Sequence, residues 1–149
     1  MIYLDYAANY PCKKEVLEAL NEVELNYIGN YNSSHEAGIK SKDKFNELDS
    51  SIKNILNLDN EHEVIYVSSA TEANNLALKG ICASYSGFGK KILVSELEHS
   101  SVNGALGYLK DNGFIVDFIK TNNDGSIMLS SLQEKLTSDV ILVCVCLVD

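Results

Sequence analysis

The sequence contains no arginine: its 12 basic residues are all lysine, and they stand against 21 acidic residues. The net charge of −9 repels nucleic-acid phosphates, and the planar fork with which arginine grips guanine, carboxylates and phosphates is missing. We therefore expect no nucleic-acid partner. The same absence bears on enzymes that act on amino acids, because these usually hold the substrate carboxylate with an arginine.

Long apolar runs and metal-ligand spacings are also absent. The longest apolar run, residues 140–148, is far too short to cross a bilayer and predicts a buried strand. The first charge, Asp5, comes too early for a signal peptide. We expect a cytoplasmic protein with no membrane partner, no metal site and four reduced cysteines, namely Cys12, Cys82, Cys144 and Cys146.

Helical and strand patterns alternate along the chain, and only one proline, Pro11, interrupts them. The apolar spacing predicts helices at about residues 14–27, 45–56, 70–81, 102–109 and 131–136. Short β-branched runs predict strands at residues 64–67, 92–94, 114–116 and 140–146. This order predicts an α/β fold with a mostly parallel sheet and helices on both faces.

A group of hydroxyl residues follows the strand predicted at residues 64–67. Ser68, Ser69 and Thr71 stand where that strand would end and a helix begin, so free amides and hydroxyls there could bind a phosphate. The alternative is an ordinary helix cap with Glu72 in the first turn, and spacing alone favours the cap.

His99 occupies the corresponding position one strand later. An imidazole at this edge could stack on a flat ligand or move protons, or it could simply begin a helix. Glu96 and Glu98 beside it raise the possibility of a metal, but no second histidine stands at ligand spacing.

Five segments resemble, in the same order along the chain, those of the cysteine desulfurases. Three departures are Asn9 for the usual threonine, Tyr31 for a proline and Ser69 for a glycine. The similar segments are Tyr3–Ala8 with Pro11, Gly29-Asn30 with Ser33–His35, Ser68–Gly80, Glu98-His99 with Val102, and the final strand up to Asp149.

The resemblance implies a truncated large domain of a fold-type-I, class-V aminotransferase-like enzyme that uses pyridoxal 5′-phosphate. Residues 1–13 would belong to its small-domain region and residues 14–149 to an incomplete cofactor domain. Thr71 and the amide after Ala70 would hold the cofactor phosphate. His99 would stack on the pyridine ring and act in catalysis, and Asn30 and His35 would lie near the substrate.

The implied activity is sulfur transfer from L-cysteine through a persulfide, which leaves alanine. The Schiff-base lysine, the aspartate at the pyridine nitrogen, the substrate arginine and the mobile cysteine would lie outside these residues. We therefore expect the 149 residues alone to be inactive and not to retain the cofactor. We also expect a homodimer or self-association through an open sheet edge. The alternatives are a selenocysteine lyase or other class-V aminotransferase, a non-catalytic assembly module, and a nucleotide-binding flavodoxin-like domain.

Overall fold

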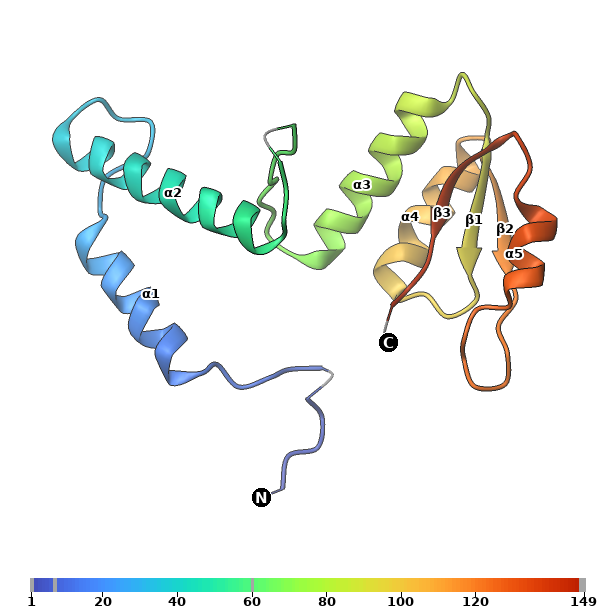
Figure 1. Cartoon of the computed structure of the whole chain (residues 1–149), viewed down its shortest axis with the longest axis horizontal. Helices are drawn as coiled ribbons and strands as arrows, with labels where there is room; N and C mark the ends of the chain where they lie inside the picture. Colours follow the sequence, from blue (N-terminus) through green and yellow to red (C-terminus); the bar gives the residue numbers. More distant parts are fainter. Residues whose placement is uncertain (1, 7, 60, 148–149) are drawn as a thin grey trace. The chain divides into compact units, whose positions relative to one another are not determined.

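The computed structural model describes residues 2–6, 8–59 and 61–147, and the chain divides into two compact units, Met1–Tyr66 and Val67–Asp149 (Figure 1). Each unit is described by itself. Ala7 of the opening motif, and Val148 and Asp149 at the end of the last apolar run, lie outside the described residues. No helix in the described ranges combines the length and apolar character that a membrane span requires.

The first unit contains the helices α1 (Lys14–Asn26) and α2 (Glu36–Ile55). The loop between them packs closely on the start of α2, because a Cβ added to Gly29 would collide with the backbone of Ala37. Ser41 in α2 donates a hydrogen bond to the carbonyl of Tyr27 at 3.2 Å and so holds the same loop. The helix predicted at residues 14–27 is confirmed, and the second helix begins earlier than its apolar pattern suggested.

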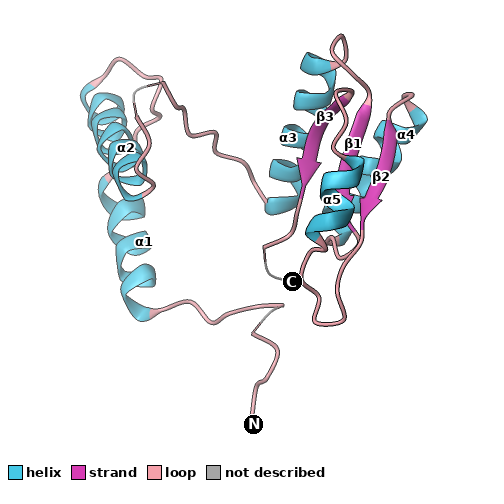
Figure 2. Cartoon of the chain, turned by 45° about the vertical axis from the view of Figure 1, so that its right-hand side comes forward, coloured by secondary structure: helices cyan, strands magenta, loops and turns pink. Residues whose placement is uncertain are grey.

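The second unit is a three-stranded parallel sheet in the order β2-β1-β3, as Figure 2 shows. The strands are β1 (Lys91–Ser95), β2 (Ile115–Ile119) and β3 (Val140–Cys144), and the helices are α3 (Ala70–Tyr85), α4 (Ser100–Asp111) and α5 (Leu129–Lys135). The α4 crossover joins β1 to β2, and the α5 crossover returns past β1 to β3. With right-handed connections, these two helices cover opposite faces.

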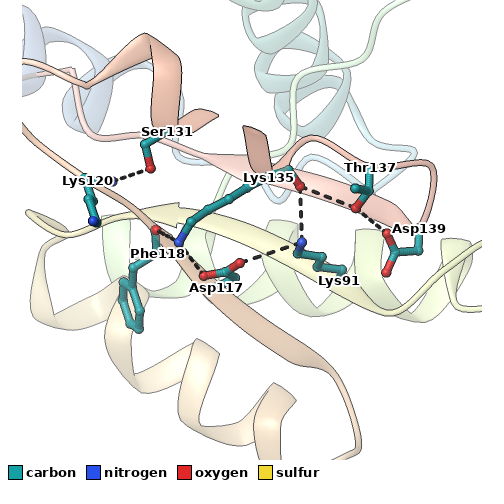
Figure 3. A network of polar contacts seen from close by, with 8 residues as sticks. All are labelled: Lys91, Asp117, Phe118, Lys120, Ser131, Lys135, Thr137 and Asp139. Atoms are coloured by element: carbon teal, nitrogen blue, oxygen red, sulfur yellow. Dashed lines mark hydrogen bonds and ion pairs between the residues drawn. The ribbon is translucent and has the colours of Figure 1, made fainter. Parts of the chain in front are cut away.

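The core of this unit follows from the alternation of side chains along β1. Ile92 and Val94 point to one face and pack in a buried cluster with α3 and α4 residues such as Leu78 and Leu106. Leu93 is also fully buried, and its register partner on β2 is Asp117, which α5 contacts through Lys135 (Figure 3). The predicted α/β fold with a parallel sheet and helices on both faces is confirmed.

Some predicted strands differ from the observed ones. Residues 64–67 form no strand: among the described strands none pairs with them, and Ile65 and Tyr66 are 68% and 49% exposed, so neither the ladder nor the burial that a strand needs is present. The strand predicted at 114–116 runs from Ile115 to Ile119, and the last strand ends at Cys144 rather than at residue 146.

Candidate functional site

The N-terminus of α3 is capped by its own side chains. Ser69 accepts a hydrogen bond from the Glu72 amide at 3.2 Å, and the Glu72 carboxylate accepts from the amide and hydroxyl of Ser68 at 2.8 and 2.7 Å. The Ser68 hydroxyl, followed by the Ser68 amide, lowers the pKa of Glu72. The predicted cap is therefore real, and it engages both serines.

The cap leaves other donors of α3 available. The amides of Ala70 and Thr71 and the Thr71 hydroxyl form no hydrogen bond as donors to any residue that the structure describes. Both residues are exposed. Free amides at the positive end of a 16-residue helix suit an anion such as a phosphate. The cap and the anion site are thus compatible, because they use different groups.

His99 lies directly before α4 and caps it. Its Nδ1 accepts the Ser101 amide at 3.2 Å and lies 2.9 Å from the Ser101 hydroxyl. The ring therefore stands at the edge of the sheet where β1 ends, as its place in the sequence predicted.

A side-chain hydrogen bond joins the beginnings of α3 and α4. Asn74 Nδ2 donates to Ser101 Oγ at 2.9 Å, and Thr71 stands one helical turn before Asn74 on the same side of α3. Thr71 and His99 therefore lie at the same end of the unit, where α3 and α4 begin. Nothing in the sequence singled out Asn74 and Ser101, because their partnership exists only after folding.

Two glutamates tie together the loops that follow the strands. Glu96 accepts from the Thr121 amide at 3.1 Å, and Glu98 accepts from the Cys146 amide at 2.7 Å and from the Ser95 hydroxyl. These carboxylates are thus engaged with backbone and hydroxyl donors. Among the described residues, no group of three or more potential ligands is arranged to hold a metal ion.

The thiol of Cys144 is unsuited to nucleophilic chemistry. Burial in the first place, and the nearby Glu98 carboxylate in the second, raise its pKa to about 11. Burial also raises the pKa of Cys82. Because the thiolate is the reactive form, neither residue is a candidate nucleophile.

Asn30 and His35 belong to the first unit. Asn30 Oδ1 accepts from the Asn32 amide at 2.8 Å, and His35 Nδ1 accepts from the Gly38 amide at 3.2 Å as the cap of α2. A Cβ on Gly38 would collide with the Ser33 carbonyl, so the loop depends on glycine there. Both predicted residues thus form hydrogen bonds that stabilise the local backbone, and their proximity to a substrate stays a prediction.

Comparison with known proteins gives a consistent result. The family described as Aminotransferase class-V matches residues 2–149. "Cysteine desulfurase IscS 1" of Archaeoglobus fulgidus is 37% identical over 145 residues, which cover 97% of this chain and 38% of that protein. "Cysteine desulfurase IscS" of Buchnera aphidicola is 36% identical over 151 residues, with 97% and 36% covered. The chain therefore spans little more than a third of the length of these relatives.

Solved structures agree with the sequence relatives. A "NIFS-like protein" matches with a TM-score of 0.90 at 26% identity, over 97% of this chain and 39% of that one. DndA from Streptomyces lividans matches with a TM-score of 0.78 at 31% identity, over 97% and 40%. A structure described as SspA in complex with cysteine matches with a TM-score of 0.85 at 26% identity, over 96% and 41%.

Proposed function

Because the chain belongs to the class-V aminotransferase family, we propose that it carries the phosphate-binding and ring-covering part of a pyridoxal-phosphate-dependent cysteine desulfurase. The observation that supports this most is the Asn74–Ser101 hydrogen bond of 2.9 Å, since it brings the free donors of α3 and the imidazole of α4 to one end of the sheet. In this proposal residues 1–13 belong to the small-domain region and residues 14–149 to the large domain.

The residues have distinct tasks in this proposal. The amides of Ala70 and Thr71 and the Thr71 hydroxyl hold the phosphate, and His99 covers the pyridine ring and takes part in catalysis. Asn30 and His35 lie near the substrate. When bound, pyridoxal phosphate supplies the electron sink that labilises bonds at the substrate α-carbon. The substrate is L-cysteine, whose sulfur leaves as a persulfide on a cysteine thiolate while the carbon skeleton becomes alanine.

A ligand titration tests the phosphate site without requiring turnover. Pyridoxine 5′-phosphate has no aldehyde to react with lysines, and unphosphorylated pyridoxine is its matched control. We expect the phosphorylated ligand alone to shift the amide resonances of Ala70 and Thr71. Thr71→Val should weaken binding roughly tenfold, because a hydrogen bond to a charged oxygen is lost. Equal shifts with both ligands, or at amides elsewhere, would refute the site.

We also propose that these 149 residues alone do not turn over cysteine, and that they bind the cofactor reversibly but do not retain it. The support is the absence of arginine, which leaves no residue of the kind that usually binds a substrate carboxylate. The assay is release of alanine and sulfide from L-cysteine with added pyridoxal phosphate, and catalytic turnover would contradict the proposal.

Finally, we propose a cytoplasmic homodimer or other self-association through β3. Among the described strands β3 pairs only with β1, and Val143 is 41% exposed, so an apolar edge is available for another copy. The absence of disulfides among the described cysteines is compatible with the cytoplasm. Sedimentation at several concentrations should give a mass that Val143→Lys lowers and the exposed-helix control Leu129→Lys does not. A strict monomer would refute the association.

A further inference from the structure

The imidazole of His99 is held on one side, at Nδ1, by the backbone amide and the hydroxyl of Ser101. The Ser101 amide lies 3.2 Å from His99 Nδ1, and the Ser101 hydroxyl lies 2.9 Å from the same atom. Ser101 is only 7% exposed, so water does not readily replace these bonds. Behind it, Asn74 Nδ2 lies 2.9 Å from Ser101 Oγ.

The direction of these bonds follows from the chemistry of the groups. A backbone amide can only donate, so His99 Nδ1 must offer it a lone pair. The Ser101 hydroxyl accepts from Asn74 Nδ2 and keeps its single proton, which it can donate to the same lone pair of His99 Nδ1. Both donors to Nδ1 are satisfied only when the ring proton is on Nε2. A proton on Nδ1 would instead face the Ser101 N–H and break the cap of α4.

We propose that Ser101 and Asn74 are positioning residues that fix His99 as the Nε2–H tautomer. The site then presents a hydrogen-bond donor, not a base, at Nε2, since in this tautomer the ring's lone pair is on Nδ1 and already occupied. His99 forms no hydrogen bond through Nε2 with the residues that the structure describes. What this donor meets in the complete site rests on the proposed function, whereas the tautomer itself does not.

The tautomer is directly measurable in the 149-residue chain. Two-bond proton–nitrogen correlation spectra of a ¹⁵N-histidine sample at alkaline pH distinguish Nε2–H from Nδ1–H rings. The chain has three histidines, and His99→Gln identifies the His99 signals by their loss. We expect the Nε2–H pattern for His99 in the unmodified protein. A predominant Nδ1–H pattern for His99 would overturn the proposal.

Variants then test which residues set the tautomer. Ser101→Ala removes the hydroxyl donor but keeps the backbone donor, so the Nδ1–H to Nε2–H ratio should rise about fivefold, the effect of one net hydrogen bond. Asn74→Ala should change the ratio in the same direction, and Ser101→Thr should restore it. Ser100→Ala is the matched control, because Ser100 is exposed and its hydroxyl forms no hydrogen bond with a described residue. Ratios that match this control in both variants would overturn the role of Ser101 and Asn74.

The two proposals fail separately. If pyridoxine 5′-phosphate does not bind at Ala70 and Thr71, the cofactor assignment falls and the tautomer measurement is untouched. If His99 is the Nδ1–H tautomer, the positioning role falls while phosphate binding can still be observed.

Discussion

Asp117 of β2 is the centre of the polar network that fastens α5 to the sheet (Figure 3). Lys135 Nζ lies 2.7 Å from Asp117 Oδ1 and donates to the Phe118 carbonyl at 2.6 Å. Lys91 Nζ lies 3.7 Å from Asp117 Oδ2 and donates to the Lys135 carbonyl at 3.2 Å. One carboxylate thus faces two ammonium groups. Asp117→Asn keeps the shape of the side chain and leaves the two lysines with no anion between them.

The stability expected to be lost in Asp117→Asn lies between the contribution of a surface ion pair and that of a buried one. Hydrogen bonds to charged groups are worth about 1.5–3 kcal/mol, whereas exposed pairs contribute about 0–1 kcal/mol. The Asp117 side chain is 35% exposed and that of Lys135 is 25% exposed, so solvent screening reduces the larger figure. We expect Asp117→Asn to lower the free energy of unfolding by about 1 kcal/mol at neutral pH.

The pH dependence has a definite sign. The hydrogen bond from Lys135 lowers the pKa of Asp117 more than burial raises it. A group whose pKa is lower in the folded state contributes stability above its unfolded pKa, about 3.9, and loses it as the pH falls through the lower folded value. The difference in the free energy of unfolding between the wild type and Asp117→Asn should therefore be constant from neutral pH to about 4.5 and shrink below roughly 4.

Urea unfolding followed by circular dichroism measures this difference, and hydrogen exchange of the β2 amides assigns it to the second unit. Asp111→Asn is the matched control, because Asp111 is exposed at the end of α4 and its side chain forms no hydrogen bond or ion pair with described residues. Three results would refute the reasoning: an Asp117→Asn effect equal to that of the control, no measurable effect at neutral pH, or a difference that persists unchanged in acid.

Two further predictions concern close packing and thiol chemistry. Gly89→Ala should destabilise the second unit by about 1–3 kcal/mol, because the new Cβ would collide with the Asp139 carbonyl. In the control Gly87→Ala the new Cβ meets open space, so the urea midpoint should change very little. Equal urea midpoints for the two variants would contradict the prediction. In alkylation at neutral pH followed by mass spectrometry, Cys144, with its pKa raised to about 11, should react at least roughly tenfold more slowly than the exposed Cys12. Similar rates would show that the Cys144 thiol is neither buried nor held protonated.

The sequence predicted the helices and central strands well because their signals are local. The apolar spacing of α1 and the β-branched run of β1 depend on neighbours within a few residues, and both elements form where expected. The strand predicted at 64–67 failed for the opposite reason. A β-branched run favours an extended backbone, but a strand also needs a hydrogen-bonded partner strand. No described strand pairs with Ile65.

The site shows the same division between local and distant information. Ser69 was predictable as a cap, since Ser69 and Glu72 stand only three residues apart in the sequence and form a local capping pattern. The Glu98–Cys146 contact spans 48 residues and the Asn74–Ser101 contact spans 27, so no local sequence motif could predict either contact. The glutamates beside His99 raised the question of a metal. Their observed partners are donors from neighbouring loops, which no pattern of ligand spacing describes.

An acidic chain without arginine can hold a phosphate through its lysines or through uncharged N–H and O–H donors, and the proposed site uses donors of the second kind. Its net charge of −9 offers no long-range attraction, so binding must come from short-range donors fixed in advance. The helix α3 provides such donors at Ala70 and Thr71, whereas the Glu72 amide is bonded to Ser69 and the Glu72 carboxylate to Ser68. In the tautomer proposed for His99, the Nε2–H group is a further uncharged donor. Recognition in this proposal depends on the direction of N–H and O–H bonds toward the charged oxygens of the phosphate.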